Sequence, residues 1–304
     1  MTKSPCRRQR ILQVYQHHIR QVAGYSPKTW RNHAQVLTQF LESVSIQRAA
    51  QLARLTPTRL TKYLTDRSKE YQPGSLRQIG GVLRHFLRFA QQQGWIVEPL
   101  SLAVPSIARR ADHELPVYLN QSQLELLLKS WDRRTAEGRR NLAIGLCLAR
   151  LGVRAGEVAA LSLEDIDWRQ GVLRIADSKT RRAAQLPLLN EVGRCLADYL
   201  RDGRPACSHR QIFVFHHPVR PMNGQAISRV IAQALGRCGL QVPRPGAHLL
   251  RHTLASHLVQ NGASFKEVAD ILRHQHLNST GVYAHLDEEH LRLAAQPWPK
   301  EAAL

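Results

Sequence analysis

A chain of 304 residues is long enough for two ordinary domains, because a single hydrophobic core rarely grows much beyond about 250 residues. Its 43 Lys and Arg residues outnumber 23 Asp and Glu residues, which gives a formal charge of +20. Such a charge costs self-repulsion and is typical of proteins that bind a polyanion, nucleic acid first of all. A basic protein whose charge only keeps it soluble, or one that binds an acidic membrane, is the alternative.

Secretion, membrane insertion and a metal held by cysteines are all disfavoured. The first residues are charged and polar and lack the apolar core of a secretory signal, and no apolar run approaches the length of a membrane span. The five cysteines are an odd number, are widely spaced and form no C-x-x-C pair, so neither a disulfide framework nor a zinc site is indicated. We therefore expect a soluble, cytoplasmic protein with no membrane partner.

The front of the chain predicts a small helical bundle with basic outer faces. Residues 1–110 hold 18 Lys and Arg against 4 Asp and Glu, a net charge of +14 that leaves only +6 for the rest. Ser26-Pro27, Thr56-Pro57 and Pro73-Gly74 each open a helix, and Gly94 ends the third. Helical spacing points these residues inward: Trp30, Ala34, Leu37, Phe40, Leu41, Leu60, Tyr63, Leu64, Leu76, Ile79, Leu83, Phe86, Leu87 and Ala90.

A linker is predicted between Pro99 and Pro116, where the helical periodicity stops and prolines accompany Arg109-Arg110. We therefore predict a helical domain over residues 1–105, a linker over 106–116 and a second domain over 117–304. The second domain is expected to be mainly helical, with helices at 120–128, 139–151, 191–200, 225–238, 249–260, 266–272 and 287–294. Strands at 172–175 and 183–186 form a predicted hairpin with a basic tip over 177–182, and 212–215 is a further candidate strand.

Clustered arginines and histidines in the second domain suggest phosphate chemistry. Cleaving a phosphodiester without a metal requires a nucleophile, cations around the non-bridging oxygens and an acid for the departing oxygen. Residues 151–157, 248–253 and 272–274 supply such side chains, and Tyr283 follows nine positions after His274. Taken singly, each has a plainer interpretation as a helix-terminal cation, a surface histidine or a packed tyrosine ring.

In their order and wording these segments resemble the two boxes of the tyrosine recombinase and phage integrase family, over nearly the whole chain. Box one resembles Gly152-Val153-Arg154 with Glu157 and the stretch from Leu161 to Asp167. Box two resembles His248-x-x-Arg251-His252-Thr253, then Ala255-Ser256-His257-Leu258, Leu272-x-His274 and Tyr283-Ala284-His285. With no arm-binding domain expected before the helical one, the architecture resembles the compact Xer-like and transposon-borne members.

The resemblance implies that two arginines and two histidines surround a phosphate. Arg154 and Arg251 would be the clamping arginines, since forked guanidinium donors suit a bidentate grip on a phosphate. His248 would accept or orient a proton. His274 would donate a hydrogen bond to a non-bridging oxygen, a role that suits an imidazole titrating near neutrality.

The resemblance also implies the nucleophile and the general acid. Tyr283 would attack the phosphate and form a 3′-phosphotyrosyl intermediate, a transesterification that needs no ATP, metal or other cofactor. Lys179, on the hairpin tip, would protonate the departing 5′ oxygen. Arg181 and Arg182 beside it could serve the phosphates electrostatically, and an exposed basic turn is the plainer alternative.

The implied protein is a two-domain, C-shaped clamp on double-stranded DNA that acts as a tetramer on paired sites and exchanges strands through a Holliday junction. Leu286, Leu291 and Leu293 would form a terminal helix that docks on a neighbour, or a self-contained one. Related recombinases and accessory proteins are further candidate partners, and a mobile element is the favoured context. A type IB-like topoisomerase and a DNA-binding repressor or architectural protein with a decayed active site are the alternatives.

Two places depart from the family pattern: the hairpin, which reads Asp177-Ser178-Lys179-Thr180 where the family is rich in glycine, and the position before His274. The family generally has glycine immediately before the box-two histidine, where this chain has Arg273. If that position requires a positive φ, arginine is disfavoured and His274 would sit differently, which would weaken catalysis and favour the DNA-binding alternative. Alternatively, Arg273 adds a phosphate contact.

Deleting residues 1–110 is expected to weaken DNA binding and to reduce its dependence on salt, because this part carries a net charge of +14. Gel shifts over a series of salt concentrations measure both quantities. An unchanged affinity with an unchanged salt slope would show that the basic front of the chain does not hold DNA.

Overall fold

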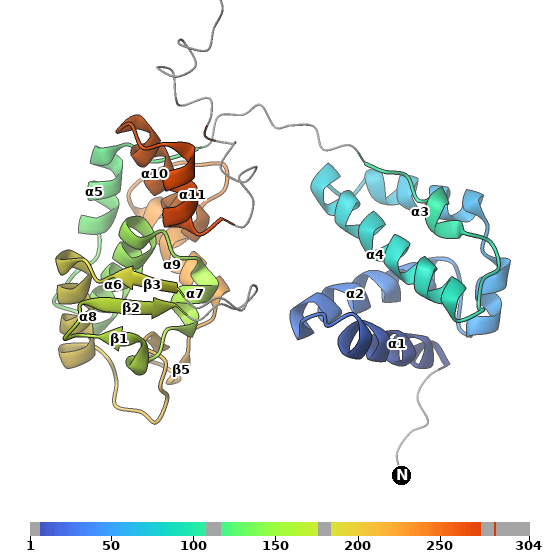
Figure 1. Cartoon of the computed structure of the whole chain (residues 1–304), viewed down its shortest axis with the longest axis horizontal. Coiled ribbons are helices and arrows are strands. Elements are labelled where there is room, and N and C mark those ends of the chain that lie inside the picture. Colours follow the sequence, from blue (N-terminus) through green and yellow to red (C-terminus); the bar gives the residue numbers. More distant parts are fainter. Residues whose placement is uncertain (1–6, 108–116, 176–183, 275–282, 284–304) are drawn as a thin grey trace, which may run out of the picture. The chain divides into compact units, whose positions relative to one another are not determined.

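The computed structural model describes residues 7–107, 117–175, 184–274 and 283. The chain divides into two compact units, residues 1–113 and 114–304 (Figure 1). The predicted fold class, mainly helical with a small sheet, is confirmed. Within the described ranges, no helix is both long and apolar enough to cross a membrane.

The first unit is a bundle of four α-helices with short turns between them. They are α1 (Arg7–His17), α2 (Pro27–Ser43), α3 (Pro57–Ser68) and α4 (Pro73–Gln92), with a π-turn at His18–Val22 and 3₁₀ turns at Ala49–Arg54 and Leu100–Ala103. The hydroxyl groups of Ser26 and Thr56 accept hydrogen bonds from the first-turn amides of α2 and α3. The predicted starts of these two helices are therefore confirmed.

Helix α1 precedes the first helix predicted from the sequence. Its inward face consists of Ile11 and Tyr15, continued by Ile19 in the π-turn, and all three are buried. The Tyr15 hydroxyl hydrogen-bonds Nδ1 of His33 at 2.9 Å and Nδ1 of His85 at 2.8 Å. These bonds tie α1 to α2 and α4. Burial lowers the pKa of both imidazoles, so both rings are neutral at physiological pH.

The second unit combines helices with a small antiparallel sheet that lies at one face (Figure 1). The helices are α5 (Gln121–Lys129), α6 (Ala136–Leu151), α7 (Ala155–Ala160), α8 (Asn190–Asp202), α9 (Gly224–Arg237), α10 (Ala247–Gln260) and α11 (Phe265–Leu272). The three-stranded sheet has the order β1 (Ile166–Asp167), β2 (Val172–Ile175), β3 (Ala184–Pro187). Leu173 of β2 pairs with Ile166 on one side and Leu186 on the other. A separate pair joins β4 (Val214–Phe215) to β5 (Arg220–Pro221).

The predicted hairpin is confirmed as the β2–β3 pair, while its tip at 177–182 and the predicted helix at 287–294 lie outside the described residues. Only residues 214–215 of the candidate strand at 212–215 are paired as a strand. The short elements α7, β1 and β5 were not predicted, because two to six residues are too few to display a period.

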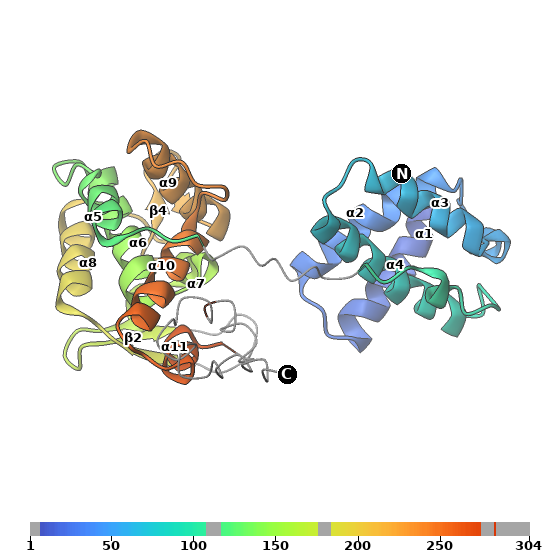
Figure 2. The ribbon, with the colours of Figure 1, turned by 90° about the horizontal axis from the view of Figure 1, so that it is seen from above.

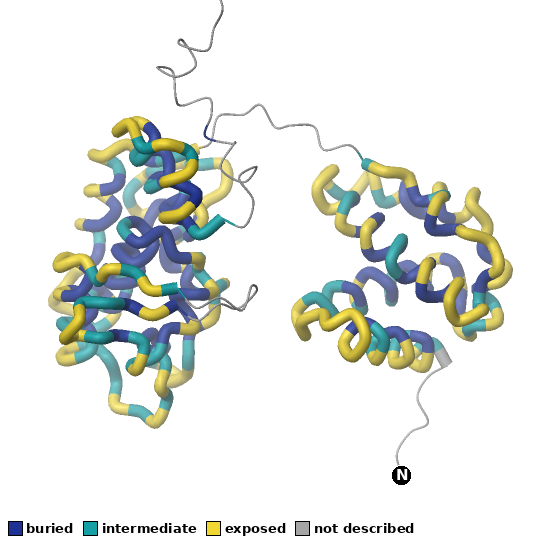
Figure 3. The backbone as a smooth tube through the Cα atoms, in the orientation of Figure 1, coloured by how far each residue is buried: buried dark blue, intermediate teal, exposed yellow. Residues whose placement is uncertain are grey.

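Helix α6 is the centre of the second unit and leads directly to the candidate site. Eleven of its sixteen residues are buried, which is typical of a helix enclosed by others (Figure 3). It packs against α8 and α10 and lies between them in both views of the ribbon (Figure 2). Gly152 ends α6 in the left-handed conformation, as predicted, with φ of 58°. Arg154 therefore follows this buried helix by three residues.

Gly145 allows α6 to approach Trp131 closely, because an added Cβ would lie 2.6 Å from the indole ring. Gly145→Ala is expected to destabilise the second unit by about 1–3 kcal/mol, although alanine is the better helix former. Gly236→Ala is the matched control in α9, where an added Cβ meets nothing within 4 Å. It should leave stability unchanged or raise it by up to about 1 kcal/mol. Chemical denaturation measures both, and equal stabilities would contradict the packing argument.

Candidate active site

Three segments far apart in the sequence meet at the candidate site: the turn between α6 and α7, helix α10, and the end of α11. A Cβ on Gly152 would lie 2.8 Å from the side chain of Leu272, so the ends of α6 and α11 are in close contact. Arg154 is the N-cap residue of α7, His248 and Arg251 lie on α10, and His274 lies two residues beyond the end of α11.

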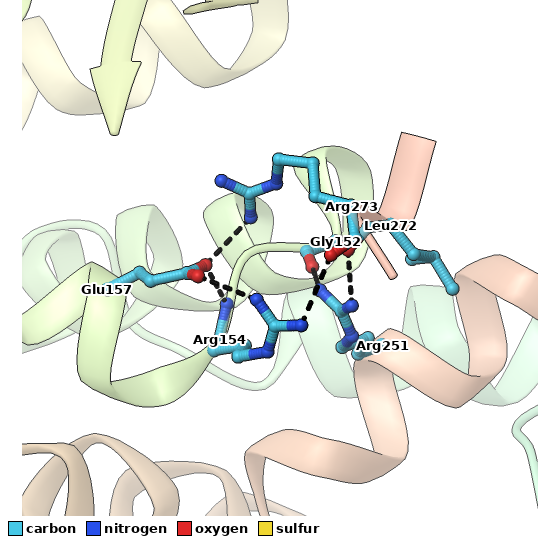
Figure 4. A network of polar contacts seen from close by, with 6 residues as sticks. All are labelled: Gly152, Arg154, Glu157, Arg251, Leu272 and Arg273. Atoms are coloured by element: carbon cyan, nitrogen blue, oxygen red, sulfur yellow. Dashed lines mark hydrogen bonds and ion pairs between the residues drawn. The ribbon is translucent and has the colours of Figure 1, made fainter. Parts of the chain in front are cut away.

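Arg251 joins the ends of α6 and α11. Its Nη1 donates to the carbonyl of Gly152 and its Nη2 donates to the carbonyl of Leu272 (Figure 4). Such helix-terminal carbonyls have no partner within their own helix and require one from elsewhere. The side chain is buried at 3 % exposure. Burial and the charge of Arg154 lower its pKa to about 10, which still leaves it charged at neutral pH.

Arg154 is the accessible arginine of the site, with 44 % of its side chain exposed. Its backbone N–H and its Nη1 donate to the two carboxylate oxygens of Glu157, at 2.8 and 2.9 Å. Its Nη2 donates to the carbonyl of Arg273 over 3.4 Å, the longest contact in the network. Burial by itself would raise the pKa of Glu157, because it disfavours the charged carboxylate. The hydrogen bond from the Arg154 N–H and the charges of Arg273 and Arg154 outweigh this effect and keep the pKa below its usual value.

Arg273 does adopt the backbone conformation that favours glycine, with φ of 54° and ψ of 50°. Its side chain turns back across the site, and Nη2 donates to Oε2 of Glu157 at 2.7 Å (Figure 4). Arg273 thus contacts the Arg154–Glu157 pair twice, through its carbonyl and through its guanidinium. The amide of the next residue, His274, donates to the carbonyl of Ala269 in α11, so the turn is closed by a backbone hydrogen bond.

Tyr283 lies in a small core between α10 and α11, with 2 % of its surface exposed. Its hydroxyl oxygen is 2.5 Å from Nδ1 of His252, and the ring of His252 is in turn 5.1 Å from that of His248, measured between centroids. Burial raises the pKa of Tyr283 to about 12, although the charge of Arg251 opposes this. The phenol is therefore protonated at neutral pH and has a ring nitrogen beside it.

The three histidines of the site are neutral at physiological pH. Burial, reinforced by the neighbouring positive charges, lowers the pKa of His252 and of His274 to about 4 and also lowers that of His248. A neutral imidazole accepts a proton at one nitrogen and donates from the other. The site therefore combines fixed cations with groups that can move protons.

The structure brings together five of the six residues predicted from the sequence: Arg154, His248, Arg251, His274 and Tyr283. Lys179, with Arg181 and Arg182, lies outside the described residues. No role was predicted for His252, although it stands four positions after His248 and so shares its face of α10. Among the described residues, no group of three or more His, Cys, Asp or Glu is placed to hold a metal ion.

Comparisons with known proteins agree with this architecture. The sequence pattern of the phage integrase family matches residues 117–290, and that of the phage integrase N-terminal SAM-like domain matches residues 12–94. The protein y4rA of Sinorhizobium fredii, named as an integrase/recombinase, is 34 % identical over 293 residues, 96 % of this chain and 71 % of that protein. The tyrosine recombinase XerC of Oceanobacillus iheyensis is 28 % identical over 278 residues, 89 % of this chain and 88 % of that one.

Solved structures share the fold. The XerH site-specific recombinase bound to palindromic difH substrate, in a post-cleavage complex, matches with a TM-score of 0.71 and 20 % identity, over 89 % of this chain and 80 % of that one. A lambda integrase dimer bound to a COC′ core site matches with a TM-score of 0.70 and 18 % identity, over 96 % and 99 %. Fold and site together define the class of the tyrosine recombinases. The chain belongs to the phage integrase family.

Replacing His252 with alanine leaves the buried hydroxyl of Tyr283 without its partner. The expected loss in the free energy of unfolding is about 1–3 kcal/mol, the cost of an unsatisfied buried polar group. Tyr283→Phe removes the hydroxyl itself, so the double variant should lose less than the sum of the two single variants. Chemical denaturation of the four proteins measures this coupling, and strictly additive losses would contradict the hydrogen bond.

Proposed function

We propose that this protein cuts and rejoins DNA strands by forming a temporary covalent bond between Tyr283 and a backbone phosphate, as a site-specific recombinase. The convergence of two arginines and a buried tyrosine with a neutral imidazole at its hydroxyl carries the proposal. No single residue of the set would support it, since each has an ordinary structural use elsewhere in proteins.

Arg154 and Arg251 are proposed to bind the phosphate that is attacked. Guanidinium groups suit this task because their donors match phosphate oxygens in pairs, and fixed donors stabilise the negative charge that develops in the transition state. Arg154 is exposed and makes its longest hydrogen bond, 3.4 Å, to the carbonyl of Arg273. A charged phosphate oxygen is a stronger acceptor than this carbonyl and would replace it.

The proposed reaction is a displacement at phosphorus. The Tyr283 oxygen forms a bond to phosphorus while the bond from phosphorus to the 5′ oxygen breaks, leaving a 3′-phosphotyrosyl linkage and a free 5′ hydroxyl. The phenolic proton passes to Nδ1 of His252, which lies 2.5 Å away and is neutral. The 5′ oxygen takes a proton from Lys179, as the family resemblance implies. Attack by another strand's 5′ hydroxyl reverses these steps and rejoins DNA.

The remaining histidines have supporting roles in the proposal. His274 donates to a non-bridging oxygen, and its place beside Arg154 and Arg251 supports this role. His248 orients the proton acceptor, and its ring lies beside that of His252. Neutral rings at these positions keep one nitrogen free of a hydrogen to accept and one N–H to donate.

We further propose that residues 1–105 form a domain that holds double-stranded DNA and that residues 117–304 form the catalytic domain. Residues 106–116 would be the linker between them. Four copies would exchange strands between two sites through a Holliday junction, for a mobile element. Support comes from the basic charge of the first unit, from relatives named integrase/recombinase, and from the Tn1549 transposon integrase in complex with a circular intermediate DNA. That structure matches with a TM-score of 0.71 and 16 % identity, over 93 % of this chain and 98 % of that one.

The alternative of a DNA-binding protein with a decayed site depended on Arg273. The residue adopts the left-handed conformation that disfavours arginine. The place of His274 within electrostatic reach of Arg154 and Arg251 nevertheless supports the enzyme over this alternative.

Covalent trapping tests the proposal. On nicked suicide DNA, the wild type is expected to form an adduct that survives denaturing electrophoresis, whereas Tyr283→Phe should bind the DNA and form none. Tyr118→Phe is the matched control, because it also removes one hydroxyl, which is bonded to Gln260 of α10, and should form the adduct. A wild type that forms no adduct would contradict the proposal. Relaxation of plasmid DNA without exchange between two sites would favour the topoisomerase.

A further inference from the structure

Glu157 is a buried carboxylate shared by two arginines. Only 6 % of the residue is exposed, and it accepts three hydrogen bonds: from the Arg154 backbone, from Arg154 Nη1 and from Arg273 Nη2 (Figure 4). A buried charge is tolerated when it is paired and its hydrogen-bonding capacity is filled, and removing one partner from such a pair is strongly unfavourable. If one of these arginines moves away, the other must therefore remain paired with Glu157.

Arg154 has two competing tasks under the proposed function. In the structure its Nη1 donates to Glu157 and its Nη2 to the carbonyl of Arg273, so two protein acceptors set the orientation of the guanidinium, whereas a bidentate grip requires the guanidinium to face the phosphate. A guanidinium that turns to face the phosphate draws Nη1 away from the carboxylate. The backbone N–H of Arg154 stays in place, but it is a dipole and supplies no compensating full charge.

Arg273 keeps its contact with Glu157 when Arg154 turns. Its Nη2 is 2.7 Å from Oε2, whereas Arg154 Nη1 is on Oε1, so the two guanidiniums occupy different oxygens. Only 17 % of the Arg273 side chain is exposed, which confines it to this place.

The side chain of Arg273 is held there at a cost. Its backbone is left-handed, a conformation that L side chains rarely adopt, and its Nε is buried without a hydrogen-bond partner in the described part of the chain. A residue that persists in an unfavourable conformation is held by its surroundings, and such residues concentrate at functional sites. The contact with Glu157 is the side-chain ion pair that the structure gives this residue.

We propose that Arg273 is a positioning residue: it acts as a standing counter-ion of Glu157 and so releases the guanidinium of Arg154 to bind the phosphate. This inference rests on the proposed function. It assigns a use to a residue that stands where the family generally has glycine, and it places Arg273 outside direct contact with the DNA.

The test compares single-turnover rates of adduct formation on saturating suicide DNA. Arg273→Gly removes the counter-ion and suits the positive φ, so the variant should fold and bind DNA. Its rate should fall by about 10- to 100-fold, the range found for residues that orient the ligands of a metal site. Arg273→Lys keeps the charge and should lose less. Arg194→Ala is the control for loss of one positive charge, since this exposed residue of α8 lies outside the network, and should react at the wild-type rate.

Rescue distinguishes positioning from a general structural role. In Arg273→Gly/Glu157→Gln the neutral amide needs no counter-ion, so the rate should return to that of Glu157→Gln alone. A double variant slower than Glu157→Gln alone overturns the inference, and so does an Arg273→Gly rate equal to that of the wild type while Tyr283 still forms the adduct. A wild type that forms no adduct overturns the proposed function and the inference together.

Discussion

The contact on which the site depends is that between the buried guanidinium of Arg251 and the terminal carbonyls of α6 and α11. Without these hydrogen bonds, two carbonyl groups and a full charge would be buried without partners, which proteins rarely tolerate. A guanidinium has five N–H donors, and two of its nitrogens serve the carbonyls here. The same residue can therefore hold the ends of two helices together and still offer donors to a phosphate.

Charge is distributed unevenly within this frame. Arg154, Arg251 and Arg273 are cationic, Glu157 is the anion bonded to two of them, and the nearby histidines are neutral. An excess of positive charge in a partly buried place is unfavourable until an anion enters. This distribution suits the proposed binding of a phosphate, while the movable protons reside on imidazoles whose pKa values burial and these cations have lowered.

The parts of this arrangement that depend on local sequence, such as the ends of helices, could be predicted from the sequence. Ser26 and Thr56 mark helix starts because a hydroxyl before proline caps the first turn, and Gly152 marks the end of α6 because its φ is positive. Helix α1 could not be predicted so readily, since its apolar face is narrow and its other residues are mostly arginine and glutamine.

Contacts between distant residues were beyond sequence reasoning. His252 and Tyr283 are 31 positions apart, and Glu157 and Arg273 are 116 apart, so their pairing follows from how α7, α10 and α11 pack. The positive φ of residue 273 could be anticipated from the family's glycine, but the partner of its side chain could not. Spacing along one helix, as between His248 and His252, was the signal that sequence reasoning could have used.

The hydroxyl of Tyr15 in the first unit constrains the tautomers of His33 and His85. A phenol has one hydrogen to donate, yet it meets Nδ1 of His33 on one side and Nδ1 of His85 on the other. One ring must therefore carry its hydrogen on Nδ1 and the other on Nε2, so two histidines with the same partner atom are chemically different. If the accepting ring gained a proton, the phenol would lose its acceptor. The packing of α1 against α2 and α4 thus also requires the two histidine rings to carry their hydrogens on different nitrogens.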